Sequence, residues 1–363
     1  MITFKMLRIV ASAMLAITVA ASADNVDPII EWVRSKGGYF SEKIEVRRMD
    51  PTDPNSYFGV FAREDVDKKE RLMDVPKSCY LGIWDIKVNA SKTKFNDNLC
   101  LNAQKLMNET KLGTKSEFAP YLTYLETQKP GQIPAMWSES GQKLLRKVAP
   151  EGKKGTLLDW MDKHKESGCI QSGNVFEEHA MEIIIQRGFD IFLIPVWDMV
   201  NHDNGRINTE HNPMNSEEGI KVWASKDILA GEEFFMSYDF CTDCSGTENK
   251  WGTPEILRDF GFVEPYPQRW TFHEPEIWFE IHEEDGELEA YFDTWKPNKE
   301  RVEFLEEMLE RLENVADHVL TQKDQVPQHE WNVIWLFHQA CVTAFSTALE
   351  DIEDDFPEVN TEL

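Results

Sequence analysis

The chain has 363 residues, of which 41% are hydrophobic and 11% aromatic, and it carries a formal net charge of −27 at pH 7. These proportions exclude a disordered chain and are typical of a globular protein with one large core and a satellite, or with two domains. The charge excludes electrostatic binding of nucleic acid as the main function. We interpret the acidic charge first as a means of keeping the protein soluble, and second as a surface that attracts a basic partner.

The first 23 residues have the pattern of a secretory signal peptide. Lys5 and Arg8 precede the uncharged residues 9–20, and residues 21–23 (Ala-Ser-Ala) form a cleavage site. The stretch is too short to span a membrane well, and no later stretch is apolar for long enough. We expect cleavage after residue 23 and entry into the secretory pathway, leading to the ER lumen, to secretion or to a plastid. A mitochondrial presequence or a mis-started gene is the alternative, and a misread signal would leave the protein in the cytosol or nucleus.

Two β segments, residues 59–82 and 220–240, frame a region with helical periodicity, residues 83–190. Each β segment has an apolar stretch, a polar turn and a second apolar stretch, which predicts a β-hairpin. The two segments share four positions at identical spacing: Ala62, Asp65, Val66 and Glu70 correspond to Ala224, Asp227, Ile228 and Glu232. If the two segments pack together, the helical region must protrude from one sheet-based core.

Residues 192–212, FLIPVWDMVNHDNGRINTEHN, run from an apolar stretch directly into amides, acids and imidazoles. Trp197 and Met199 are interleaved with these polar groups, which a solvated loop does not require. On the residues alone, Asn201 and His202 are best explained as side chains that satisfy backbone groups in a turn.

Cys241 and Cys244 form a single C-x-x-C pair among six cysteines. One pair supplies two of the four ligands that structural zinc needs, and no second pair exists. We therefore expect no metal, and a local disulfide or a redox pair at these two positions. Six cysteines are compatible with an oxidising compartment.

The last hundred residues have a different texture. Alternation around Glu284, Asp285 and Gly286 predicts a hairpin. Apolar residues then recur every three or four positions over residues 302–319 and again over 331–349, which predicts two helices. We expect residues 266–363 to form a small helical domain with a disordered acidic end.

Three motifs occur in the order found in the C-terminal half of a SET domain, and the chain resembles that family. They are FLIPVWDMVNHDNG (residues 192–205), AGEEFFMSYD (230–239) and EILRDFGFVE (255–264). Residues 117–145 are similar to the helical insert of one branch, which comprises the Rubisco large-subunit lysine methyltransferase and the actin histidine methyltransferase. The combination is specific, whereas each motif alone is weak evidence.

The resemblance implies an α+β fold. A SET-domain β-fold of small sheets with a pseudoknot is expected over residues 24–265, interrupted by the helical insert at about 83–190. A mainly helical, substrate-binding-like domain is expected over 266–363.

The implied function is S-adenosylmethionine-dependent methylation of a protein, with a lysine side chain as the expected acceptor. Methyl transfer to an amine needs alignment and a dry channel more than covalent help from the protein. Tyr238 matches the family's catalytic tyrosine, whose buried hydroxyl can orient the amine and the methyl group. The residues alone would also allow Tyr238 to be an ordinary core tyrosine.

The resemblance assigns the other site residues as well. Asn201 and His202 are expected to contact the cofactor, Asp198 to support the same wall, and Phe260 to pack on the adenine. Phe189 and Trp197 are expected to bind the substrate, because two aromatic faces suit an alkyl-ammonium group. The full cofactor-binding set is Tyr57, Phe58, Gly59, Arg187, Asp198, Asn201, His202 and Phe260.

Three departures keep other functions open. Tyr57 and Asp239 each stand at a position where the family has a glycine. The third departure is the secretory address, which is unusual for this branch. These features favour a non-catalytic SET-fold binding module as one alternative. A protein histidine methyltransferase is the other, because residues 192–205 look closest to the actin enzyme. That enzyme has an asparagine where this chain has Phe189, which favours lysine. We expect a monomer with a protein substrate, without nucleic acid and without a membrane after signal cleavage.

Overall fold

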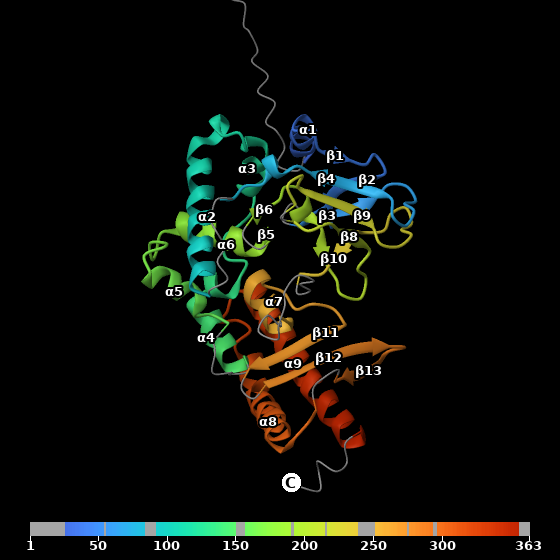
Figure 1. Cartoon of the computed structure of the whole chain (residues 1–363). Helices are drawn as coiled ribbons and strands as arrows, with labels where there is room; N and C mark the ends of the chain where they lie inside the picture. The colour runs from blue at the N-terminus through green and yellow to red at the C-terminus, as the bar shows by residue number, and fades with distance from the viewer. Residues whose placement is uncertain are drawn as a thin grey trace, which may run out of the picture.

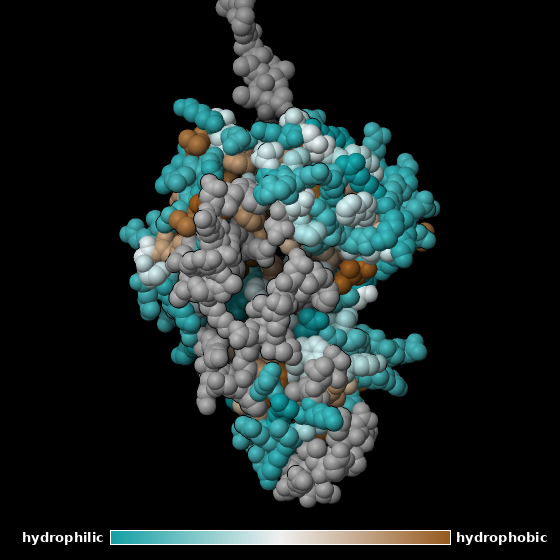
Figure 2. Space-filling view, viewed as in Figure 1, coloured by the Kyte–Doolittle hydropathy of each residue, from teal (hydrophilic) through white to brown (hydrophobic). Residues whose placement is uncertain are grey.

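The computed structural model describes nine stretches of the chain, which are residues 26–53, 56–83, 92–149, 157–189, 192–214, 216–238, 251–273, 276–292 and 296–355. The predicted signal peptide, Asp239, the C-x-x-C pair and the predicted acidic end lie outside them. Figure 1 shows a β-rich part at the upper right, helices on the left and the C-terminal region below. Hydrophilic residues cover most of the described surface in Figure 2, in line with the charge of −27. Within the described stretches, every helix lacks the length or the apolar character needed to cross a bilayer.

The β-rich part consists of short strands in several small sheets. A four-stranded antiparallel sheet has the order β1-β4-β9-β8, and β2 pairs antiparallel with β3. The bounds are α1 Asp27–Ser35, β1 Tyr39–Phe40, β2 Ile44–Arg48, β3 Phe58–Ala62, β4 Arg71–Val75, β8 Thr209–His211 and β9 Ile220–Ala224. All five residues of β3 are buried, which explains its unbroken apolar sequence.

The two predicted hairpins do not form. Strands β3 and β4 come from one predicted hairpin, yet they pair with β2 and β9. Strands β9 and β10 (Phe235–Met236) come from the other, yet β9 pairs with β4 and β8, and β10 pairs with β7 (Asn201–His202). The apolar stretches therefore identified strands but not their partners.

The polar turns of the two segments pair with each other instead. The backbone groups of Val66 and Ile228 exchange two hydrogen bonds of 2.9 Å. The carboxylate of Asp65 accepts from the backbone N–H of Ala230, and Asp227 accepts reciprocally from Lys68. Because the positions that the two segments share occupy equivalent places, the repeat is a local two-fold arrangement. The two segments therefore pack together, which was the condition for a single sheet-based core with the insert protruding from it.

The described residues of the insert form five helices, which lie left of the sheets in Figure 1. Their bounds are α2 Lys92–Leu112, α3 Ala119–Leu125, α4 Glu139–Val148, α5 Trp160–Glu166 and α6 Val175–Arg187, with short 3-10 turns at η2 Gly113–Lys115 and η3 Pro134–Met136. A further 3-10 turn, η1 Lys77–Cys79, precedes the insert. A disulfide joins Cys100 in α2 to Cys169 after α5. This pairing was not predicted from the sequence.

A second hydrophobic core lies in the C-terminal region. The predicted hairpin and both predicted helices are present, in β12 Glu276–Glu284, β13 Glu287–Tyr291, α8 Lys299–Thr321 and α9 Gln328–Asp355. Strand β11 Gln268–His273 adds a third strand, so the region is not purely helical. Leu144 and Leu145 of α4 are buried in this core, which divides the insert between the two cores.

The segments with the functional motifs meet where the two cores adjoin. They are β5 Gly188–Phe189, β6 Phe192–Leu193, η4 Trp197–Met199, β7, β10 and α7 Thr253–Phe260. Strand β7 runs parallel to β10, with Asn201 opposite Phe235 and His202 opposite Met236. Beyond β7 the chain returns to β10, because the Asn208 amide binds both the carbonyl of Glu233 and the N–H of Phe235. This crossing brings residues distant in sequence to one place.

Candidate active site

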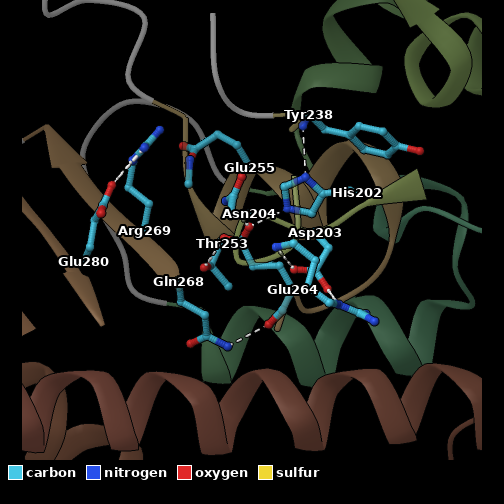
Figure 3. Close-up of polar contacts among 12 residues, drawn as sticks. His202, Asp203, Asn204, Tyr238, Thr253, Glu255, Glu264, Gln268, Arg269 and Glu280 are labelled. Carbon is cyan, nitrogen blue, oxygen red and sulfur yellow. Dashed lines mark hydrogen bonds and ion pairs between the residues drawn. The ribbon is translucent and has the colours of Figure 1, made fainter. Parts of the chain in front are cut away.

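His202 lies at the centre of a buried polar cluster, which Figure 3 shows between Tyr238 and Glu264. Its Nε2 lies 2.7 Å from Oε2 of Glu264, and its Nδ1 accepts from the backbone N–H of Tyr238 at 2.9 Å. These partners assign the neutral tautomer with the proton on Nε2. Since both ring nitrogens are engaged and the side chain is fully buried, neither nitrogen is left for a ligand.

Glu264 connects this histidine to helix α7. Its Oε1 accepts from the hydroxyl of Thr253 at 2.6 Å, and its Oε2 also accepts from the amide of Asn204 at 3.1 Å. We call His202, Glu264, Thr253 and Asn204 the fastening cluster. It joins β7, the tyrosine segment and the first turn of α7, so it orders the surroundings of the site.

Asn201, the neighbour of His202, is bonded differently. Its Nδ2 donates to the carbonyl of Phe58 at 3.1 Å and to Oε1 of Glu233 at 2.6 Å. Its Oδ1 accepts no hydrogen bond from any described residue. A Cβ at position 59 would lie 2.5 Å from Oε1 of Glu233 and 3.1 Å from Nδ2 of Asn201. Gly59 is therefore required for the close approach of β3 to these two side chains.

Arg187 and Asp198 form a second buried polar group. Nη1 of Arg187 donates to the Asp198 carbonyl at 3.1 Å and lies 3.4 Å from Oδ2, while the Tyr121 hydroxyl donates to that Oδ2 at 2.9 Å. Nη2 of Arg187 donates to Oε1 of Gln128 at 2.6 Å. We call Arg187, Asp198, Tyr121 and Asn201 the acceptor cluster, since it leaves carboxylate and amide oxygens unused.

Oδ1 of Asp198 is the most informative of these unused atoms. It is buried and has no hydrogen-bond partner among the described residues. Burial raises the pKa of Asp198 to about 6, against the opposing effects of Arg187 and Tyr121. An unsatisfied carboxylate oxygen is costly in a protein interior, and in native structures it often marks a functional group.

Tyr238 packs its ring between Phe260 and His202, with centroid distances of 4.6 and 5.2 Å. Its hydroxyl donates to the carbonyl of Val200 at 2.9 Å, directly before Asn201. Burial raises the pKa of the phenol, so the hydroxyl stays neutral at physiological pH. Phe260, the last residue of α7, therefore lies against Tyr238 and next to the fastening cluster.

Phe189 and Trp197 are in contact, with ring centroids 5.9 Å apart and planes inclined at 31°. The indole of Trp197 is wholly buried, and His211 of β8 contacts it edge-on at 5.4 Å. Phe189 is half-buried. The two residues form one aromatic surface; their role in substrate binding stays a prediction.

The side chain of Tyr57 is 64% exposed. The predicted site residues thus lie in one region, but the sequence did not point to several of their partners. Tyr121, Gln128 and Glu264 are 77, 59 and 62 residues from the groups that they bind. All three lie inside the motifs of residues 117–145 and 255–264, but no spacing rule assigns their partners.

A comparison with protein families matches the SET domain over residues 57–239, which is half of the chain. The protein therefore belongs to the SET-domain family, and the predicted family and fold class are confirmed.

The relatives come from one group of methyltransferases. The chain is 23% identical over 280 residues to N-lysine methyltransferase setd6 of Xenopus tropicalis, covering 67% of this chain and 58% of that protein. It is 24% identical over 252 residues to setd6 of Xenopus laevis, covering 59% and 52%. The chain thus spans little more than half the length of these relatives.

Solved structures extend the comparison to nearly the whole chain. The SET domain of LSMT bound to lysine and AdoHcy matches with a TM-score of 0.54 and 13% identity, over 93% of this chain and 92% of that one. Rubisco LSMT bound to sinefungin and monomethyllysine matches with 0.53 and 14%, over 94% of both chains. Because identity is low, these matches establish the fold, including the C-terminal region.

Proposed function

We propose that the protein is an S-adenosylmethionine-dependent methyltransferase that transfers a methyl group to a lysine side chain of a protein substrate. Membership of the SET family supports this, as do relatives that are named N-lysine methyltransferases. The single observation that carries the proposal is the unsatisfied acceptor on Asp198. This oxygen lies beside Arg187 and Tyr121, in the segment that leads to Asn201.

The side chains present fit a cofactor that is both cationic and aromatic. Oδ1 of Asn201 is an unused acceptor that suits the ammonium group of an amino-acid head. Phe260 offers a half-buried aromatic face for the adenine. Asp198, held by Arg187, supports the same wall and gives it negative character. When bound, S-adenosylmethionine supplies a sulfonium-activated methyl carbon that an amine can attack.

In the reaction a nitrogen–carbon bond forms while the carbon–sulfur bond breaks, so the lysine ammonium must first release a proton to water. Phe189 and Trp197 would enclose the lysine alkyl chain and exclude water, which lowers the pKa of the amine. The neutral hydroxyl of Tyr238, fixed near the Val200 carbonyl, would orient the amine lone pair. Arg187 and Tyr121 hold Asp198 so that its free oxygen keeps one orientation.

The test is transfer from labelled S-adenosylmethionine to lysine- and histidine-bearing peptides and candidate proteins. Wild type should label lysine, and Tyr238→Phe should lower kcat by about 10²-fold or more with nearly unchanged cofactor affinity. Tyr57→Phe, at an exposed tyrosine, is the matched control and should retain full activity. Labelling of histidine alone would favour the histidine enzyme. Binding of cofactor without transfer to any acceptor would favour the non-catalytic module, and absence of binding would refute the proposal.

We also propose a monomer that enters the secretory pathway and acts on a basic region of its substrate. The Cys100–Cys169 disulfide supports an oxidising address, and the charge of −27 supports a basic partner. Fusion of residues 1–30 to a reporter should direct it into the secretory pathway with cleavage after residue 23. An uncleaved cytosolic reporter would contradict the address and leave the enzymatic proposal intact.

A further inference from the structure

A cluster of sulfur and nitrogen ligands lies in the helical insert, outside the candidate active site. It consists of Cys100 in α2, His164 in α5 and Cys169 in the connection to α6. The two cysteines are joined by a disulfide, with their Cα atoms 5.4 Å apart. The possible ligand atoms of all three residues lie within 4.8 Å of one another. None of the SET motifs includes these residues.

His164 is poorly explained by the disulfide-bonded state. Its side chain is buried, with 5% of the residue exposed, and its ring stands edge-on to Trp160 at 5.8 Å. Among the described residues, the one hydrogen-bond contact of the ring is from Nδ1 to Sγ of Cys100 at 3.7 Å. A sulfur is a weak acceptor, so a buried imidazole gains little from it.

We propose that Cys100, His164 and Cys169 bind a zinc ion once the disulfide between the two cysteines has been reduced. A cellular dithiol would reduce the disulfide to two thiols and would itself become a cyclic disulfide. Each thiol then releases one proton to solvent when Zn²⁺ binds, and neutral His164 supplies the third ligand. Water would fill the fourth position of the tetrahedron, as at zinc sites with three protein ligands.

The geometry suits a zinc ion without large movement of the helices. Ligand bonds of about 2.3 Å to sulfur and about 2.0 Å to nitrogen place those two atoms about 3.5 Å apart in a tetrahedron. The observed separation between His164 Nδ1 and Cys100 Sγ is 3.7 Å. The two sulfurs must separate, and rotation of the cysteine side chains can provide this because the Cα atoms are already 5.4 Å apart.

The charge of the ligand set also suits a buried site. Two thiolates, one neutral imidazole and Zn²⁺ sum to zero, which avoids the cost of burying a net charge. In either covalent state the cluster fastens α2 to the connection between α5 and α6. Helix α6 ends at Arg187 of the acceptor cluster, so the insert would keep its shape in oxidising and in reducing surroundings.

The experiment measures zinc on the full chain, both oxidised and reduced with a phosphine, because dithiols bind zinc themselves. After gel filtration, metal analysis should find about one zinc per reduced chain above the amount on the oxidised chain. Cobalt(II) should give thiolate charge-transfer absorption in the reduced protein. His164→Gln keeps the disulfide and should weaken zinc binding by about tenfold or more, and Cys100→Ser should abolish it. Circular dichroism would check that each variant is folded.

A double variant, Cys241→Ser with Cys244→Ser, is the matched control, and it should keep full zinc uptake. The proposal is overturned if the reduced wild type binds no zinc, or if zinc binding survives Cys100→Ser. It is equally overturned if the double variant loses the metal, because the C-x-x-C pair would then be the site. If Cys100→Ser does not fold, equal zinc affinity of wild type and His164→Gln in the reduced state would overturn the proposal as well. All readouts are independent of methyl transfer.

Discussion

The fastening cluster and the acceptor cluster contain the neighbouring residues His202 and Asn201, but they differ in how completely their polar groups are hydrogen-bonded. In the fastening cluster both nitrogens of His202 have partners, and both oxygens of Glu264 accept hydrogen bonds. In the acceptor cluster, Asn201 and Asp198 each keep one oxygen without a partner among the described residues. A saturated polar group stabilises the fold, whereas an unsaturated one costs stability and can bind a ligand. In the dipeptide Asn201-His202, the first residue thus keeps an unused acceptor and the second has both ring nitrogens engaged.

The largest expected effect comes from removing the histidine of the fastening cluster. His202→Ala should lower the free energy of unfolding by about 3–5 kcal/mol, because it removes a hydrogen bond from the buried Glu264 carboxylate, leaves the backbone N–H of Tyr238 without its partner and leaves a cavity. The measurement is chemical denaturation followed by circular dichroism. His329→Ala is the matched control, since the side chain of His329 is 66% exposed, and it should cost less than about 0.5 kcal/mol. A cost below about 1 kcal/mol for His202→Ala would show that the cluster does not fasten the fold.

The second prediction concerns the pH dependence of stability in the acceptor cluster. The folded-state pKa of Asp198, raised to about 6, lies above its ordinary value of 3.8. Its contribution to stability is therefore fully present below about pH 4 and is lost as the pH rises through about 6. The free energy of unfolding of wild type, relative to Asp198→Asn, should fall over that window by up to about 3 kcal/mol.

Glu255→Gln provides a control for this window. Burial raises the pKa of Glu255 to about 7. Its contribution to the free energy of unfolding is therefore lost at a higher pH than that of Asp198. The two pH windows overlap up to about pH 6, and above that only the difference between wild type and Glu255→Gln should keep changing, up to about pH 7. If wild type and Asp198→Asn run parallel from pH 4 to 6, Asp198 is charged in the folded protein, and its free oxygen has a partner that we have not identified.

What the sequence could predict follows the range over which each signal acts. The aromatic contact of Phe189 with Trp197 and the C-terminal hairpin depend on neighbouring residues or on a known motif, and both were predicted. The predicted strand pairing was wrong. The apolar sequence of β3 shows that it is a buried strand, but it does not show that its partners are β2 and, through Phe61, the distant residue Glu233. The Cys100–Cys169 disulfide joins residues 69 apart, so no local sequence pattern indicates it. The C-x-x-C spacing is a local pattern, and the predicted disulfide was placed there.

The third prediction separates two asparagines, Asn201 in strand β7 and Asn204 just after it. Asn201→Ala should weaken S-adenosylmethionine binding by about tenfold or more, or about 1.4 kcal/mol, because it removes the unused acceptor. Asn204→Ala, in the fastening cluster, should leave the affinity within about twofold, since its amide serves Glu264. Calorimetry on the full chain measures both. Equal affinities for the two variants would remove Asn201 from the cofactor site.

The smallest effect is expected at Tyr57, where the family has a glycine. Crowding by this tyrosine would be an argument against cofactor binding, but its side chain is 64% exposed. The narrow approach is at Gly59 instead, where a Cβ would meet Glu233 and Asn201. Tyr57→Gly should therefore change S-adenosylmethionine affinity by less than about twofold, and backbone entropy should cost only about 0.5–1 kcal/mol of stability. Calorimetry and denaturation measure the two quantities. A tenfold gain in affinity would show that Tyr57 obstructs the site, and would strengthen the case for a binding module that has lost the reaction.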